Sequence, residues 1–161
     1  MTRVLLAVVS TVALCATAFT TLAQDDELEF ASQIEARQSL MKVNRFYLGL
    51  LGGMARGNIP YDAELASNAA DNMLAINRMK NGAMWPAGSD LSAEGYEGVS
   101  YAKPELWANY DEIREKGQAL TEALETMAAV AGDGLEAVQA NVGAIGNGCK
   151  GCHEIARVKR D

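Results

Sequence analysis

Apolar positions along the chain recur at alternating steps of four and three residues, the spacing of one face of an α-helix. Four segments show this pattern, at about residues 27–56, 62–81, 104–131 and 133–156. Val, Ile and Thr are sparse while Ala and Leu are abundant, so the composition favours helices over strands. The first seam reads Phe30, Ile34, Arg37, Met41, Asn44, Leu48, Leu51, Ala55. The pattern predicts an all-α fold, an antiparallel four-helix bundle.

The ends of the predicted helices carry local signals. Asp62 is a plausible N-cap for the second helix, and Pro104 suits the first turn of the third. Asp133 and Glu136 resemble a capping box at the start of the fourth. Between the second and third helices lies a loop of about twenty residues, 82–103, and loops of this length are often functional.

The N-terminus has the pattern of a secretory signal peptide. Arg3 precedes an apolar run over residues 4–19, and small residues follow, with a cleavage site predicted after Ala23. A membrane anchor is the alternative, but the run is at the lower limit for a span, about 17 residues. The prediction is a signal peptide over 1–23 and one mature domain over 24–161, without a membrane span and exported to the periplasm.

Charge and residue types exclude several classes of function. The chain has 14 basic and 21 acidic residues, a net charge of −7, which disfavours nucleic acid and anionic membranes as partners. It has one histidine, and no Ser/His pair or paired carboxylates stand out, so acid–base enzyme chemistry is not expected. Export places the mature cysteines in an oxidising compartment, where a disulfide is possible.

The stretch GCKGCHEIAR near the C-terminus holds both mature cysteines, Cys149 and Cys152, and the histidine, His153. Both cysteines continue the apolar seam of the fourth helix, so they are expected to face the interior. A zinc site, a thioredoxin-like motif and a disulfide within the helix are alternatives, and so is a haem-free interaction protein with an incidental CxxC. However, C-x-x-C-H is the attachment signature of c-type haem, with the histidine as axial iron ligand. The motif predicts one covalently attached haem c.

A CxxCH motif on the last helix of an exported four-helix bundle resembles the class II cytochromes c, and most of all cytochrome c′. RQSLM at 37–41, GNIPYDA at 57–63, MWPAGSD at 84–90 and KPELW at 103–107 are similar to family segments, as is the C-terminal CKGCHEIAR. The likeness covers nearly all of residues 24–161.

The resemblance implies roles for individual residues. Cys149 and Cys152 would form the thioether bonds and His153 would bind iron. Five further side chains would surround the haem: Arg37 at a propionate, Gln38 at the haem edge, Met41 over the distal face, Arg157 beside the proximal imidazole and Tyr101 near a propionate.

The resemblance also implies a function. A five-coordinate, high-spin iron would bind small gases such as nitric oxide and carbon monoxide and exchange electrons with redox partner proteins. The alternative is a low-spin electron shuttle with Met41 as sixth ligand. A homodimer formed through the first two helices is expected, with Tyr47, Leu50 and Met54 as candidate interface residues.

Overall fold

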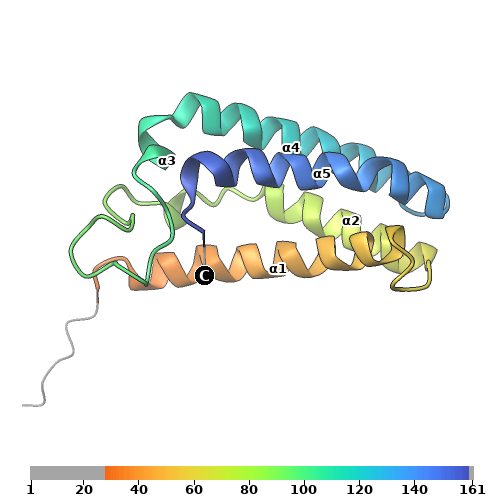
Figure 1. Ribbon diagram of the computed structural model, residues 1–161, viewed down its shortest axis with the longest axis horizontal. Coiled ribbons are helices and arrows are strands. Elements are labelled where there is room, and N and C mark those ends of the chain that lie inside the picture. The colour runs from red at the N-terminus through yellow and green to blue at the C-terminus, as the bar shows by residue number, and fades with distance from the viewer. Residues whose placement is uncertain (1–27, 160–161) are drawn as a thin grey trace, which may run out of the picture.

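The computed structural model describes residues 28–159, and the predicted signal peptide lies outside this part of the chain. Four long helices run alternately up and down (Figure 1). They are α1 (Ala31–Ala55), α2 (Ala63–Arg78), α4 (Tyr110–Val130) and α5 (Leu135–Ala156), with a 3₁₀ turn η1 (Gly82–Met84) and a short helix α3 (Glu105–Ala108) between α2 and α4. The predicted all-α antiparallel four-helix bundle is confirmed.

In cross-section, the four long helices lie at the corners of a square. α1 contacts α2 and α5, and α4 contacts the same two helices. Hence α2 lies diagonally opposite α5, and α1 lies diagonally opposite α4. Among residues 28–159, no helix is long and apolar enough to cross a membrane.

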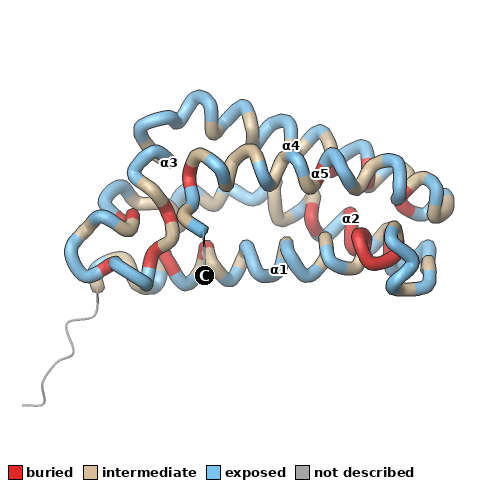
Figure 2. The backbone as a smooth tube through the Cα atoms, in the orientation of Figure 1, coloured by how far each residue is buried: buried red, intermediate tan, exposed pale blue. Residues whose placement is uncertain are grey.

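Most of the fully buried apolar side chains form one cluster in the half of the bundle remote from the C-terminus, with Ile34 of α1 outside it (Figure 2). We call this half the closed half. Its core consists of Leu51, Met54, Ala66, Ala69, Ala70, Met73, Leu124, Met127, Ala131, Val138 and Ile145. In the other half, which we call the open half, Met41 lies on the same seam of α1 yet is 41% exposed. The regular seam predicts a continuous core along the bundle. Protein side chains complete this core only in the closed half.

Two of the predicted helix starts can be compared with the structure. Asp62 caps α2 as predicted, because its side-chain oxygen accepts a hydrogen bond from the Leu65 N–H at 2.7 Å. The capping box at Asp133 is wrong. The N-cap of α5 is Gly134, whose φ of +134° favours glycine, and its N–H donates to the Tyr61 hydroxyl at 3.0 Å. The hydrogen-bond partner at the start of α5 is thus Tyr61, from the loop between α1 and α2, and not a side chain of the capping box.

The third helix is not continuous, which corrects the prediction of one helix from Pro104. It breaks at Asn109, where ψ is +38°, into α3 and α4. The Trp107 indole N–H donates to the Trp85 carbonyl at 3.2 Å, and the Lys103 N–H donates to the Ala156 carbonyl at 2.9 Å. These contacts hold α3 against the long loop and the end of α5.

Candidate functional site

Cys149, Cys152 and His153 lie on the last two turns of α5, in the open half of the bundle. Both cysteines are half-buried and neither is in a disulfide. Cys149 packs against the closed-half core, so the expectation that it faces the interior is confirmed. Because residues three apart share one face of a helix, the two thiols form one reactive edge.

Glycines bring this part of α5 close to α4. A Cβ atom added to Gly148 would lie 3.0 Å from the Leu120 Cβ, and one added to Gly151 would lie 3.3 Å from the Lys116 Cδ. Larger residues would push the helices apart or force their neighbours to move. Gly148 and Gly151 thus let the turns of α5 that carry the cysteines pack closely against Leu120 and Lys116 of α4.

Burial also sets the protonation of the three groups. It raises the pKa of both the Cys149 and Cys152 thiols. The pKa of His153 is lowered, first by burial and then by the positive charge of Arg157. The imidazole is therefore neutral near pH 7, the form that offers a nitrogen lone pair to a metal. Within residues 28–159, no group of three or more His, Cys, Asp or Glu side chains gathers around a common metal position.

The chain beyond α5 is fixed beside the segment that precedes α3. Ala102 and Arg157 form an antiparallel bridge, and the Val158 N–H donates to the Tyr101 carbonyl at 3.0 Å. This pairing brings Tyr101 and Arg157 to the same end of the bundle as His153. The Arg157 side chain itself is exposed.

Arg37, on α1, is only 3% exposed and is held by the long loop. Its Nη1 donates to the Ser89 hydroxyl at 2.6 Å and to the Met84 carbonyl at 3.3 Å. Its Nη2 donates to the Ser89 carbonyl at 2.6 Å and to the Ser100 hydroxyl at 2.9 Å. The guanidinium carbon also lies 4.9 Å from the centre of the Trp85 ring. All four terminal N–H hydrogens thus have acceptors within the protein.

These contacts make Arg37 the link between α1 and the loop. Burial lowers the pKa of Arg37, and the opposing charge of Asp90 partly offsets this effect. One residue on, the Gln38 side chain donates to the Val99 carbonyl at 2.7 Å. The pairing of Arg37 with a propionate stays a prediction. Sequence reasoning missed Ser89 and Ser100 as its partners, since serines in a loop give no signal of such contacts.

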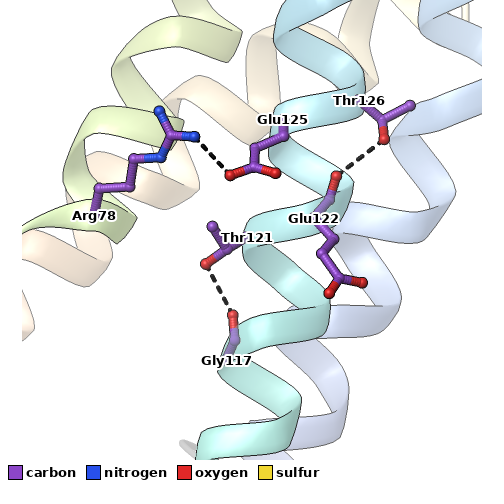
Figure 3. Close-up of polar contacts among 6 residues, drawn as sticks. All are labelled: Arg78, Gly117, Thr121, Glu122, Glu125 and Thr126. Carbon is purple, nitrogen blue, oxygen red and sulfur yellow. Dashed lines mark hydrogen bonds and ion pairs between the residues drawn. The ribbon is translucent and has the colours of Figure 1, made fainter.

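An open cleft of about 800 Å³ lies between α2 and α4. Asn77, Ile113 and Gly117 line it, together with polar residues of α4. Figure 3 shows Arg78 of α2 reaching Glu125 of α4 at 2.6 Å across this face. Its lining extends along the stretch of α4 that Gly148 and Gly151 of α5 approach, so the cleft and the CxxCH turns lie at a similar level of the bundle.

These observations fit a haem c. Two half-buried thiols stand one turn apart, a neutral imidazole follows them, and the apolar seam beside them is only partly covered by protein. A large, flat, mostly apolar group attached to the thiols would cover that seam.

Comparison with known proteins agrees with this site. The family model described as Cytochrome C′ matches residues 32–156, which include the whole CxxCH motif. The chain belongs to the cytochrome c′ family. Its cofactor is haem c, and it is a c-type haem protein.

Individual relatives cover most of the chain. A cytochrome c-554 from Cereibacter sphaeroides is 37% identical over 134 residues, spanning 83% of this chain and 98% of the relative. A cytochrome c′ from the same species is 33% identical over 127 residues, spanning 79% and 83%. The crystal structure of cytochrome c′ from Thermochromatium tepidum is 28% identical, with a TM-score of 0.71 and coverage of 82% and 98%. The relatives thus include proteins named cytochrome c′ and proteins named cytochrome c-554.

Proposed function

We propose that this cytochrome c′ family member is an exported haem protein with five-coordinate, high-spin iron. It binds small neutral gases, nitric oxide and carbon monoxide, and exchanges electrons with redox partner proteins. The observation that carries the proposal is the half-buried CxxCH edge at the end of α5, facing the half of the bundle that lacks a complete core. No acid–base machinery is assigned, so it is not proposed to be an enzyme.

Each site residue has a role in this proposal. The Cys149 and Cys152 thiols form thioether bonds with the haem vinyl groups, and His153 is the axial ligand. Arg157 lies on the proximal side, where its charge already lowers the pKa of His153. Haem iron supplies a binding position for diatomic ligands and a one-electron redox couple.

The remaining residues act at the haem edge and above it. Gln38 and Tyr101 lie at the edge, and Arg37 pairs with a propionate by exchanging one of its contacts with the long loop for that carboxylate. Met41 covers the distal face and restricts access to small ligands. A crowded apolar distal side disfavours water and anions while it admits neutral diatomic molecules.

A second candidate function is electron transfer with Met41 as sixth iron ligand. Met41 is 41% exposed, so protein side chains cover only part of it. A methionine sulfur ligand would close the iron to gases and raise its potential. The similarity to proteins named cytochrome c-554 keeps this candidate open.

The structural neighbours support gas binding and dimer formation. One is titled as a nitric oxide complex of a cytochrome c prime mutant from Alcaligenes xylosoxidans, 26% identical. Another is titled as a cytochrome c′ with ligand-controlled dimer dissociation, 28% identical. We extend both properties to this chain.

We place the dimer interface on α1, but the candidate residues differ from those chosen from the sequence. Met54 is fully buried in its own core, and Tyr47 packs against that core. Val43 and Phe46 are 42% and 61% exposed on α1, so they replace Met54 as candidates. Leu50 is half-buried and stays a candidate.

The deciding experiment is the visible spectrum of the purified holoprotein, oxidised and reduced, followed by carbon monoxide added to the reduced form. Five-coordinate iron is expected to give a broad, unsplit reduced band and to bind carbon monoxide readily. A sharp, split reduced band that does not respond to carbon monoxide would establish the electron-shuttle function instead. Met41→Ala then separates the candidates, since only a Met-ligated iron changes its spin state. Met79→Ala, at an exposed methionine that caps the C-terminal end of α2, is the matched control.

A further inference from the structure

Two asparagines on different helices meet in the open half of the bundle. Asn77 of α2 donates from its Nδ2 to the Asn44 Oδ1 of α1 at 3.0 Å and to the Met73 carbonyl at 2.8 Å. Asn44 donates from its own Nδ2 to the Leu40 carbonyl at 3.2 Å. Both side chains are half-buried. This amide pair joins α1 to α2 where neighbouring seam positions are apolar.

The contacts fix the orientation of both amides. The Leu40 and Met73 carbonyl oxygens only accept hydrogen bonds, so each must face an amide NH₂ group. The Asn44 oxygen is then the acceptor for Asn77. Asn44 uses one of its two N–H hydrogens for Leu40, and the second is available to another acceptor. Asn77 holds the Asn44 side chain in place from the opposite helix.

The position of the pair in the bundle is equally specific. Asn44 follows Met41 by three residues, so the two side chains lie on the same face of α1, one turn apart. Asn77 lies on α2, the helix diagonally opposite α5. A flat group held by His153 of α5 would have its other face directed away from α5, toward the opposite side of the bundle where α2 lies. Asn77 also lines the 800 Å³ cleft between α2 and α4. The pair would therefore lie on the distal side of a haem held by His153, next to this cleft.

We infer that Asn44 donates a hydrogen bond to a diatomic ligand on the distal side of the haem, and that Asn77 is its positioning residue. The inference rests on the proposed gas-binding function. It predicts selectivity for ligands whose outer atom accepts a hydrogen bond, in a pocket that Met41 otherwise makes apolar. The ligand class is thus a diatomic molecule with a partially negative terminal oxygen.

The test uses the reduced holoprotein with carbon monoxide as probe. Infrared spectroscopy gives the C–O stretching frequency, and flash photolysis with ligand replacement gives the binding and dissociation rates. Asn44→Leu is expected to raise the stretching frequency, because hydrogen bonding to the bound oxygen weakens the C–O bond. Its dissociation rate should rise roughly 3- to 10-fold, the ratio that corresponds to one neutral hydrogen bond. Asn77→Leu should give several C–O bands, since the Asn44 amide loses its fixed orientation.

Two further variants serve as controls. Asn68→Leu makes the same exchange at an exposed position of α2 and should leave the spectrum unchanged. The double variant Asn44→Leu, Asn77→Leu removes both amides, so it leaves neither of them without its partner if a single variant folds poorly. It should show the same raised frequency as Asn44→Leu.

The outcomes separate the two proposals. Wild-type protein that binds carbon monoxide, with the same C–O frequency in Asn44→Leu, the double variant and Asn68→Leu, would overturn the role of Asn44 while gas binding stands. Wild-type protein that does not bind carbon monoxide would refute the proposed function, and the role of Asn44 with it. A C–O frequency that is raised in Asn44→Leu and in the double variant, but not in Asn68→Leu, supports both gas binding and the role of Asn44.

Discussion

Replacing Arg37 by methionine keeps a long apolar side chain but removes every hydrogen bond that ties α1 to the long loop through this residue. Four acceptor oxygens, on Met84, Ser89 and Ser100, lose an N–H donor, two of them from bonds of 2.6 Å, and the contact with the Trp85 ring loses its cation. The expected result is a less stable protein whose loop over residues 84–100 opens more often.

The size of the effect follows from opposing contributions. Hydrogen bonds to a charged group contribute about 1.5–3 kcal/mol each, and Arg37 makes at least three of good length. Removing the cation also recovers the several kcal/mol that its desolvation costs. The Ser89 carbonyl keeps a bond from the Ser100 hydroxyl at 2.8 Å, so the loop is not left with unpaired acceptors there. The net loss should be about 2–4 kcal/mol, a fall in Tm on the order of 10 °C.

Thermal unfolding of the holoprotein by circular dichroism measures the stability, and limited proteolysis reports whether the loop opens. Arg114→Met is the control, because Arg114 is exposed and its contact with Asp111 is long, at 3.5 Å. It should change stability by less than about 0.5 kcal/mol. Equal stability of Arg37→Met and Arg114→Met would refute the reasoning. A destabilised Arg37→Met protein with a protease-resistant loop would instead place the main role of Arg37 at the haem edge.

Three further changes test other parts of the structure. Cys149→Ser or Cys152→Ser should each retain haem through one thioether bond, and the double variant should release all haem into acidified acetone; haem that stays attached would contradict the assignment. Gly134→Ala should lower stability by about 1–3 kcal/mol in thermal melts, because φ at this N-cap is +134°, whereas Gly143→Ala, inside α5 with free space around it, should raise stability by up to about 1 kcal/mol. The pKa of Asp90 is lowered from 3.8, chiefly by the side-chain hydrogen bond from Ser92. The ionised carboxylate therefore stabilises the fold above pH 3.8, and this stabilisation disappears as the pH falls through the folded-state pKa. Asp90→Asn should be less stable than wild type at pH 7 and equally stable in strong acid, which urea unfolding at both pH values would show.

The fold followed from the sequence because the seam spacing is regular in all four segments. The same regularity explains what could not be predicted. Ile34 and Leu51 are 1% and 0% exposed, yet Met41 between them on the same seam is 41% exposed. Spacing indicates which side of a helix is apolar, but it does not tell whether protein or cofactor covers that side.

Details that depend on tertiary contacts also could not be predicted from the sequence. The start of α5 depends on the Tyr61 hydroxyl, more than 70 residues earlier in the chain. The acceptors of Arg37 come from a loop whose path has no periodic pattern. By contrast, the CxxCH motif was informative because its chemistry needs a fixed order of residues, and a helix places such neighbours on one edge.

The place of the motif within α5 links stability to function. Val138 and Ile145 are fully buried in the closed-half core, and Cys149 follows Ile145 by four residues, on the same face of the helix. Cys149 also packs against that core. A group attached there begins one turn beyond the last fully buried residue, so it extends the existing apolar layer instead of entering a separate cavity. Haem bound in this way covers the seam that protein side chains leave exposed, and binding to the folded state alone stabilises that state. The incomplete core of the open half is thus the physical reason to expect that the cofactor contributes to the stability of the fold.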